Sequence, residues 1–413
     1  MLSKAASRTA STRILPLNRV ANPFSRFALP SASITTTTTT TTTPTTSTSS
    51  KISLLDSVDT HKNFHFYAQH GRAPRVLVTG SLGQLGTGLV QLMRSKYGAD
   101  NVIATDIKRP TREFWSTGPF MYADVLDYKG LEQIVVDNGI DWVVHLSAVL
   151  SAVGEKNPQL ALNINLNGFQ NVLDLAKTHQ LRLLSPSTIG AFGPSTPKDS
   201  TPDTTIMRPN TIYGITKLHM ELMGEYYHQK HGVDFRSLRY PGIISADTQP
   251  GGGTTDYAVE IFHSALRDNH YTSFLGPDSE LPMMYITDCL RGTVELLEHP
   301  GDTLTQRVYN LDACSFSPAQ LAEEIRRQHS EDFSIGYSEP DFRQAIADSW
   351  PRSIDGSQAK VDWGWNPVYD DTSKLVAEMF KQLKPLFARQ TKQQPQEHEE
   401  HRHEYRPQQA VLA

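Results

Sequence analysis

The stretch RVLVTGSLGQLG, residues 75–86, joins a short apolar run to a turn that contains three glycines. The apolar run, residues 75–79, predicts a buried strand. Gly80 can adopt the positive φ of a tight turn, Gly83 lets the main chain approach a diphosphate, and Gly86 lets a following helix pack closely on the strand. The stretch therefore predicts the strand, turn and helix that begin a dinucleotide-binding α/β fold.

The residues after this loop support that interpretation. A helix is predicted over residues 88–94, and the N–H groups at its start would face phosphates. A second apolar strand, residues 102–105, ends in Asp106, about 20 residues beyond the last loop glycine, where an acid bonds the ribose 2′-hydroxyl. This acid favours NAD over NADP, although Lys108 and Arg109 follow directly and would soften the preference. The alternative, a flexible glycine turn, requires neither the flanking elements nor the acid.

Strands and helices continue to alternate along the chain. Further strands are predicted over residues 120–123, 142–146, 181–184 and 235–239, and helices over residues 128–138 and 163–179. This alternation predicts an α/β fold with a doubly wound parallel sheet, in which ligands bind beyond the carboxyl ends of the strands. Asp124, Ser147 and Thr188 all stand at such ends.

A phenol and an ammonium group stand four residues apart in the segment TIYGITK, residues 211–217. On a helix, this spacing puts Tyr213 and Lys217 on one face. A cation there favours the phenolate and so lowers the pKa of the tyrosine toward working pH. A base of this kind in a chain with a dinucleotide loop predicts hydride transfer to or from an alcohol or ketone.

These motifs together resemble the extended short-chain dehydrogenases, a group that includes the sugar-nucleotide epimerases. The runs HLSAVLSAVGE, PSTIGAFGP, RPNTIYGITKLHMELMGEYY and LPMMYITDCLRGTVE are similar to L-threonine 3-dehydrogenases of the short-chain type, from about residue 75 to about residue 383. The runs QPGGGTTDYAV and ADSWP, residues 249–259 and 347–351, are specific to that family. The resemblance implies an enzyme that oxidises L-threonine with NAD to L-2-amino-3-oxobutanoate, usually in the mitochondrion.

The resemblance also implies roles for single residues. Tyr213 would take the proton of the threonine β-hydroxyl while hydride leaves Cβ for the nicotinamide. Lys217 would hold the nicotinamide ribose and lower the pKa of Tyr213. Thr188 occupies the place of the usual catalytic serine and would hydrogen-bond the same hydroxyl; an ordinary strand-end threonine is the alternative, and Ser187 is the neighbour that it could be confused with. The implied cofactor contacts are Gly80, Ser81, Leu82, Gly83, Gln84, Leu85, Gly86, Asp106, Ile107, Lys108, Asp124, Val125, Tyr213, Lys217 and Ile243.

Substrate contacts are expected where the run GGGTTD, residues 251–256, opens a helix. N–H groups and the hydroxyls of Thr254 and Thr255 suit an amino-acid carboxylate, and Asp256 would attract the ammonium group. A plain helix N-cap is the alternative. Ser147 is a further expected substrate contact, together with Thr188 and Tyr213, and Ser151 is a weaker candidate.

Composition excludes several classes of protein. The net charge of −5 gives no reason to expect nucleic acid as a partner. Cys289 and Cys314 are the two cysteines, too few for a disulfide framework or a cysteine-rich zinc site, so no metal is expected. No apolar run approaches the length of a transmembrane helix. The family resemblance implies a small-molecule partner and a second copy of the chain, paired through helices 163–179 and 213–230.

Both ends of the chain differ in composition from the middle. No acidic residue precedes Asp56, and spaced arginines followed by the threonine run 35–43 are typical of a mitochondrial transit peptide and a disordered segment, over residues 1–55. A random basic tail is the alternative. The remaining expected boundaries are a linker at 56–73, a mainly NAD-binding domain at 74–245, a mainly substrate-binding lobe at 246–385 with 195–210, and a disordered tail at 386–413. His398, His401 and His403 in that tail are expected to be solvated rather than metal-bound.

Two other functions fit part of the sequence. A sugar-nucleotide epimerase or dehydratase of the same fold would need a larger pocket with basic residues for a substrate diphosphate, whereas the QPGGGTTDY run offers hydroxyls and an acid. A non-catalytic, NAD-responsive binding protein would usually lack the tyrosine–lysine pair, which is intact here.

Overall fold

The computed structural model describes residues 65–247 and 253–403, with side chains described as far as Arg389. The predicted targeting segment 1–55, the first part of the linker, Gly251, Gly252 and the end of the tail lie outside the described residues. The side chains of His398, His401 and His403 lie outside them as well.

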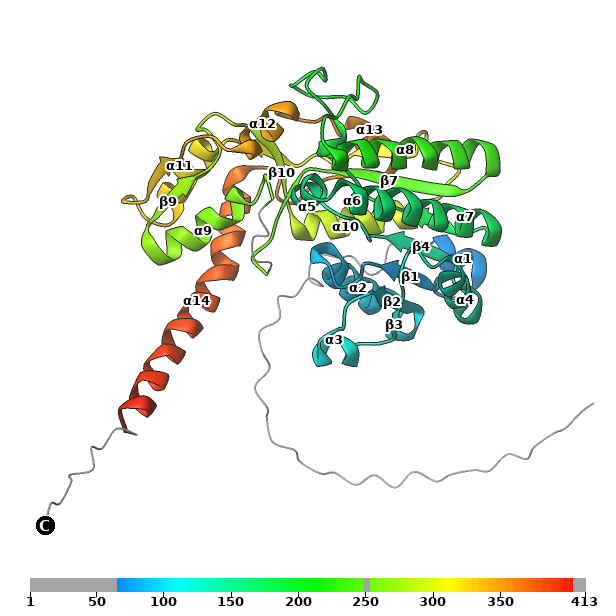
Figure 1. Cartoon of the computed structure of the whole chain (residues 1–413), viewed down its shortest axis with the longest axis horizontal. Coiled ribbons are helices and arrows are strands. Elements are labelled where there is room, and N and C mark those ends of the chain that lie inside the picture. Colours follow the sequence, from blue (N-terminus) through cyan, green and yellow to red (C-terminus); the bar gives the residue numbers. More distant parts are fainter. Residues whose placement is uncertain (1–64, 248–252, 404–413) are drawn as a thin grey trace, which may run out of the picture. The chain divides into compact units, whose positions relative to one another are not determined.

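An eight-stranded sheet forms the centre of the fold (Figure 1). Its strands are β1 (Val76–Thr79), β2 (Val102–Asp106), β3 (Phe120–Tyr122), β4 (Trp142–His145), β5 (Arg182–Leu184), β6 (Ser187–Thr188), β7 (Asp234–Tyr240) and β11 (Val308–Asn310). The order is β11-β7-β5-β4-β1-β2-β3, with β6 beside β7, and every pair is parallel. The strand order reverses at β1, so the predicted doubly wound fold is confirmed and a ligand site is expected above β1 and β4.

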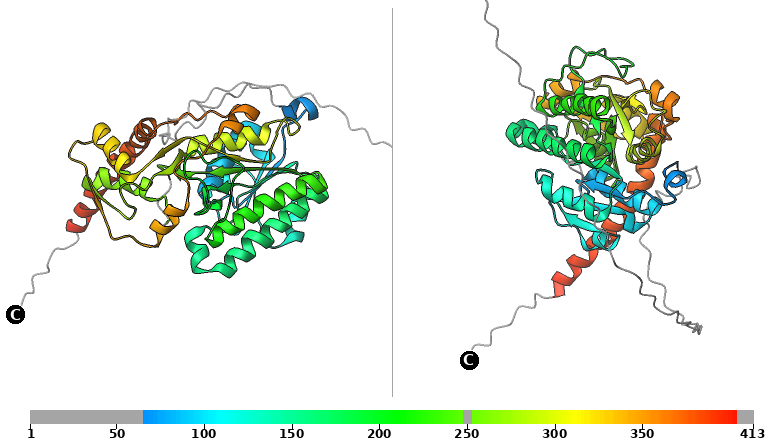
Figure 2. Two further views of the ribbon diagram at one scale, coloured as in Figure 1. Left: turned by 90° about the horizontal axis from the view of Figure 1, so that it is seen from above. Right: turned by 90° about the vertical axis from the view of Figure 1, so that its right-hand side faces the viewer.

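Helices cover both faces of this sheet. On one face, α2 (Gln84–Tyr97) packs against α10 (Ile286–Glu298); on the other, α7 (Phe169–His179) packs against α4 (Tyr128–Asn138) and α8 (Ile212–His231) (Figures 1 and 2). Strand β1 contributes side chains to the hydrophobic cores on both faces of the sheet, because Val76 and Val78 belong to one buried cluster and Leu77 to the other. Alternate strand residues point to opposite faces, which explains why its sequence is apolar throughout.

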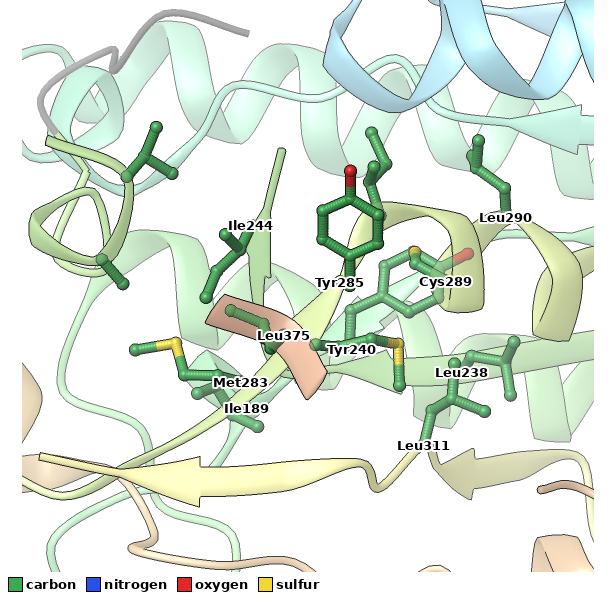
Figure 3. Close-up of a cluster of buried hydrophobic side chains, with 14 of the residues drawn as sticks. Ile189, Leu238, Tyr240, Ile244, Met283, Tyr285, Cys289, Leu290, Leu311 and Leu375 are labelled. Atoms are coloured by element: carbon green, nitrogen blue, oxygen red, sulfur yellow. The ribbon is translucent and has the colours of Figure 1, made fainter. Parts of the chain in front are cut away.

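A smaller lobe follows the sheet in sequence. It contains the strands β8 (Gly242–Ile244), β10 (Leu281–Tyr285) and β12 (Cys314–Phe316), and the parallel pair β9 (His270–Ser273) and β13 (Ser334–Tyr337). Its helices are α9 (Tyr257–Asp268), α11 (Pro318–Gln328), α12 (Phe342–Ser349) and α14 (Thr372–His403). Figure 3 shows Leu238 and Tyr240 of β7 in one buried cluster with Met283 of β10 and Leu375 of α14, so the sheet and the lobe share a core.

Short helices complete the described part of the chain. They are α1 (His65–His70), the 3-10 turns η1 (Ala99–Asn101) and η3 (Ile189–Ala191), α3 (Arg112–Ser116), α5 (Ser151–Lys156), α6 (Pro158–Leu162), the π-helical turn η2 (Asn163–Gly168) and α13 (Ser357–Trp363). No helix in residues 65–247 or 253–403 is long and apolar enough to cross a bilayer.

The structure differs from the expected domain boundaries at three places. Helix α10 packs against α2 on one face of the cofactor-binding sheet, and strand β11 pairs with the outer edge of β7. Both elements therefore lie with the sheet rather than with the lobe. Helix α1 lies within the expected linker, where Phe66 packs edge-on against Trp142 at a centroid distance of 5.2 Å. The tail expected to be disordered from residue 386 continues α14 as far as His403, in a stretch rich in the good helix formers Gln and Glu.

Candidate active site

The glycine loop lies between β1 and α2 and has no room for side chains. Gly80 has a φ of +66°, and a Cβ placed there would lie 2.7 Å from the main-chain nitrogen of Ser147. A Cβ on Gly86 would lie 2.5 Å from the carbonyl oxygen of Gly80. Gly83 precedes α2 and no side chain caps the helix, while the Ser81 hydroxyl is buried without a hydrogen-bond partner among the described residues. Uncapped N–H groups and a spare hydroxyl at a helix N-terminus fit the diphosphate of a dinucleotide.

Asp106 lies at the end of β2, beside this loop. Its carboxylate accepts hydrogen bonds from the main-chain N–H groups of Leu82 and Lys108, each at 3.0 Å. The predicted acid is therefore tied to the loop itself, where it fits the ribose of a bound dinucleotide. Ile107, Lys108 and Arg109 follow it and are exposed.

A cavity of about 290 Å³ lies at the ends of β2 and β3. Ile107, Tyr122, Ala123 and Asp124 line it, together with the start of α4, so two of the predicted cofactor contacts, Ile107 and Asp124, meet here. Its place at the carboxyl edge of the sheet suits the adenine end of the cofactor. The side chain of Val125 is buried in the core, and its carbonyl oxygen accepts from Asn171 Nδ2 of α7 at 2.9 Å, so the predicted cofactor contact of Val125 would be through its main-chain nitrogen.

Tyr213 and Thr188 lie close together on either side of Gly190. Tyr213 stands in the first turn of α8, which begins where the Thr211 side chain accepts a hydrogen bond from Gly214 N at 3.1 Å. Thr188 ends β6, and its hydroxyl accepts from Gly190 N at 3.1 Å. Burial raises the pKa of Tyr213 to about 12, and a hydrogen bond with Thr188 opposes this rise. The two hydroxyl groups therefore lie close enough for both to reach one substrate oxygen, which is the role predicted for them.

Lys217 does not lower the pKa of Tyr213 in this structure as the sequence predicts. Its Nζ lies 5.8 Å from the centroid of the Tyr213 ring and donates to the carbonyl oxygen of Pro186 at 2.7 Å. Burial lowers the pKa of Lys217 to about 8, and burial likewise dominates at Tyr213. Desolvation therefore sets the direction of the pKa shift in both groups.

Ser187 is excluded as the catalytic hydroxyl by its contacts. It is buried on the other side of β6, where its hydroxyl donates to the carboxylate of Glu221. Neighbouring strand residues point to opposite faces of a sheet, so Thr188 faces Tyr213 while Ser187 faces away. The choice of Thr188 over its neighbour follows from this alternation.

The expected substrate residues lie on three elements. Ser147 is half-buried after β4 and next to Gly80, and Ser151 begins α5. Thr254 is buried; Thr255 packs on Gly242, the residue before the half-buried Ile243. Asp256 precedes α9, and its carboxylate accepts from Gly253 N at 2.8 Å rather than capping the helix.

This arrangement matches a known family. The model of the NAD dependent epimerase/dehydratase family matches residues 76–312. The chain belongs to this family. The predicted resemblance and the predicted NAD cofactor are thereby confirmed.

Within the epimerase/dehydratase family, the chain is similar to threonine dehydrogenases. Mitochondrial L-threonine 3-dehydrogenase of Sus scrofa is 55% identical over 309 residues, which cover 75% of this chain and 83% of the relative. The crystal structure of L-threonine dehydrogenase from Phytophthora infestans has 53% identity and a TM-score of 0.72, covering 76% of this chain and 99% of that one. The holo form of the Cupriavidus necator enzyme has 47% identity and a TM-score of 0.72, covering 76% and 100%.

One buried residue near the site was missed from the sequence. Asn165, in the π-helical turn η2, accepts from Val149 N at 2.8 Å and donates to Val149 O and Thr216 Oγ1, both at 3.0 Å. It thus fixes the segment after Ser147 against α8, which carries Tyr213. An asparagine between apolar residues of a predicted helix was the available signal, because a buried amide needs partners.

Proposed function

We propose that this member of the epimerase/dehydratase family oxidises L-threonine at Cβ, with NAD as the hydride acceptor, and yields L-2-amino-3-oxobutanoate. The observation that carries the proposal is that Tyr213 and Thr188 lie together around Gly190, where an added Cβ would lie 3.6 Å from Tyr213 Cδ1 and 3.5 Å from Thr188 Oγ1, at the carboxyl edge of the sheet beside a glycine loop built for a dinucleotide. The similar proteins named as threonine dehydrogenases support threonine as the substrate.

Tyr213 acts as the general base in this proposal. When bound, NAD supplies the electrophilic nicotinamide carbon that takes the hydride and a positive charge near the phenol. Thr188 orients the substrate β-hydroxyl and donates to the Tyr213 oxygen as it loses its proton. Lys217, held by the Pro186 carbonyl, supplies a cation on the same helix face. Ile243 would contact the nicotinamide of a bound NAD.

The amino-acid end of the substrate is assigned to the segment before α9. The hydroxyl groups of Thr254 and Thr255 and the helix N-terminus would receive the carboxylate, and Asp256 would attract the ammonium group. Ser147, next to the loop, completes the site from the other side. The Asp256–Gly253 hydrogen bond keeps this turn in place before substrate binds.

The deciding experiment follows NADH absorbance with L-threonine and, in parallel, the conversion of UDP-sugars by chromatography, because an epimerase or dehydratase regenerates its NAD in each turnover. Turnover of L-threonine alone is expected. A rate with a UDP-sugar but not with threonine would favour the epimerase or dehydratase alternative, and no turnover of either would favour a binding protein. NADP is expected to react more slowly, because Asp106 would repel its 2′-phosphate.

A homodimer paired through α7 and α8 belongs to the same proposal. Ile215, Leu222 and Tyr226 form an exposed apolar stripe on α8, at 47%, 58% and 48% exposure. Their spacing of seven and four residues puts them on one helical face. An exposed stripe of this kind marks a surface that another protein surface covers.

Mitochondrial localisation is the last part of the proposal. The mammalian relatives are named as mitochondrial enzymes, and residues 1–55 carry spaced arginines and no acid. A fluorescent reporter fused behind residues 1–55 is expected to enter mitochondria. A cytosolic reporter would refute the location without affecting the chemistry.

A further inference from the structure

A buried charged cluster lies directly behind the proposed catalytic residues. It consists of Glu221 on α8, Arg239 on β7 and Ser187 on β6, all at most 5% exposed. Arg239 binds the Glu221 carboxylate through two nitrogens, Nε at 2.9 Å and Nη2 at 2.8 Å. The Ser187 hydroxyl donates to the same carboxylate. We call these three residues the Glu221 cluster.

The Glu221 cluster joins the elements that carry the proposed chemistry. Ser187 immediately precedes Thr188, and strand β6 pairs with β7 so that Ser187 lies opposite Arg239. Glu221 follows Lys217 by four residues on α8, one helical turn away on the same face. One carboxylate therefore fixes β6 and β7 against the helix that presents Tyr213 and Lys217.

Among the titratable groups around Lys217, Glu221 is the one that favours the charged form of its ammonium group. On α8, Lys217 is faced by Tyr213 and by the Glu221 carboxylate, which raises the pKa of Lys217 against its burial. From β4 it is faced by His145, whose pKa falls to about 3 through burial and the Lys217 charge, so this imidazole is neutral. From β7, Arg239 is already engaged by Glu221.

We propose that Glu221 is a positioning residue for the dehydrogenase reaction, which keeps the Lys217 ammonium group charged and tethers the strand that bears Thr188. The proposal rests on the functions proposed above for Tyr213, Lys217 and Thr188. A buried Glu–Arg pair can also serve stability alone. The two roles differ in their effect on the pH dependence of the reaction.

The test compares kcat between pH 6 and pH 10 for Glu221→Gln and Glu225→Gln at saturating NAD and L-threonine. Lys217 loses its proton as pH rises through its pKa, which is about 8 with Glu221 in place. Without the carboxylate this pKa is lower, so the alkaline limb of kcat is expected to move down by roughly one pH unit. Glu225 is one turn further along α8 and half-buried, and its removal is expected to leave the limb in place.

Glu221→Gln leaves the Arg239 guanidinium buried without its carboxylate, which can prevent folding. The double variant Glu221→Gln/Arg239→Gln removes both charges and is expected to fold and to show a smaller downward shift, because the Arg239 cation that repels the Lys217 ammonium group is removed as well. Ser187→Ala cuts only the tether: kcat is expected to fall a few-fold across the whole range, with the alkaline limb unchanged. If neither Glu221 variant folds, or if a folded one keeps the wild-type limb, Glu221 serves stability alone and the proposal is wrong.

Failure of the proposed active site would look different. Lys217→Met and Tyr213→Phe are measured alongside, with NAD binding followed by calorimetry. If those two variants keep wild-type kcat, the catalytic assignment itself is wrong. If they lose activity while Glu221→Gln keeps the wild-type pH profile, only the role of Glu221 is overturned.

Discussion

Tyr213 must give up a proton that its surroundings hold firmly. Burial raises its pKa to about 12, so near neutral pH the residue is a phenol. A group whose pKa is raised stays protonated until the pH exceeds that value, and a general base works best when its pKa is close to the working pH. Thr188 is the group of this chain that lowers the pKa of Tyr213 against its burial, and Lys217 Nζ lies 5.8 Å from the centroid of the Tyr213 ring.

Tyr213→Phe removes only the hydroxyl oxygen and so tests the role of Tyr213 as the general base. The variant keeps the ring and is expected to lower kcat roughly a hundredfold to ten-thousandfold, the contribution of a positioned general base. NAD affinity, measured by calorimetry, is expected to change little. Tyr226→Phe is the matched control, because Tyr226 is an exposed tyrosine of the same helix. A Tyr213→Phe enzyme with more than about a tenth of the wild-type rate would show that another group takes the proton.

The sequence predicted the residue types of the site better than their surroundings. Tyr213, Lys217 and Asp106 could be assigned because their chemistry and spacing are set by neighbours in sequence. The raised pKa of Tyr213 could not be predicted, because it depends on burial by segments that are distant in sequence. Glu221 was missed for the same reason: its partners Ser187 and Arg239 lie 34 and 18 residues away.

At the scale of elements, the glycine loop offers a controlled test of close approach. Gly80 and Gly71 have nearly equal φ values, +66° and +67°, but an added Cβ meets the Ser147 main chain at Gly80 and nothing within 4 Å at Gly71. Both alanine variants carry the backbone cost of about 1–2 kcal/mol. Gly80→Ala is expected to lose a further 1–3 kcal/mol or so through the clash.

Thermal unfolding with and without NAD measures this difference. Gly71→Ala is expected to lower the melting temperature slightly and to keep the stabilisation that NAD confers, which follows from its affinity. Gly80→Ala is expected to melt lower and to gain little from NAD. Equal behaviour of the two variants would mean that the approach of the loop to Ser147 is unimportant for the cofactor.

The start of α9 is the element assigned to the substrate. Losing a hydrogen bond to a charged group costs about 1.5–3 kcal/mol, so alanine at Thr254, Thr255 or Asp256 is expected to lower kcat/KM for threonine roughly tenfold to a hundredfold. NAD affinity measured without threonine is expected to stay unchanged. Asp268→Ala, at the far end of the same helix, is the control. Equal losses of NAD and threonine binding would make the segment a cofactor support and move the substrate site toward Ser147 and Ser151.

Most elements could be predicted because their signals are local. The helix predicted over residues 128–138 matches α4, and the strand at 102–105 differs from β2 by one residue. Helix α10 and strand β11 fall within the range expected to be mainly lobe but pack with the sheet, because the chain returns to the sheet after β10 and periodicity does not reveal which surface an element covers. The π-helical turn within the predicted helix 163–179 depends on a tertiary contact of Asn165, which sequence spacing does not show.

At the scale of the whole molecule, the exposed apolar stripe on α8 bears on whether the chain pairs with a second copy. Leu218 and Met223 are partly buried within the protomer, whereas Leu222 is 58% exposed. The sequence predicted that an apolar face of this helix is covered, and the structure leaves Leu222 uncovered within one chain. A second copy is the proposed cover, because this face is apolar and adjoins the helices α5 and α6, which expose Val153 and Leu160.

Leu222→Glu is expected to halve the mass measured by light scattering after gel filtration. A carboxylate in the centre of an apolar interface would be desolvated without a partner, which disfavours association. Val361→Glu is the matched control: Val361 is 78% exposed on α13, which packs on β11 and is not part of the α8 stripe, so the dimer mass is expected to remain. A wild-type monomer would refute the dimer, and a Leu222→Glu dimer would place the interface on another surface. Because Tyr213 and Lys217 project from the same helix, loss of the partner is also expected to lower kcat, and activity measured across a dilution series of the wild-type enzyme checks this coupling independently of any substitution.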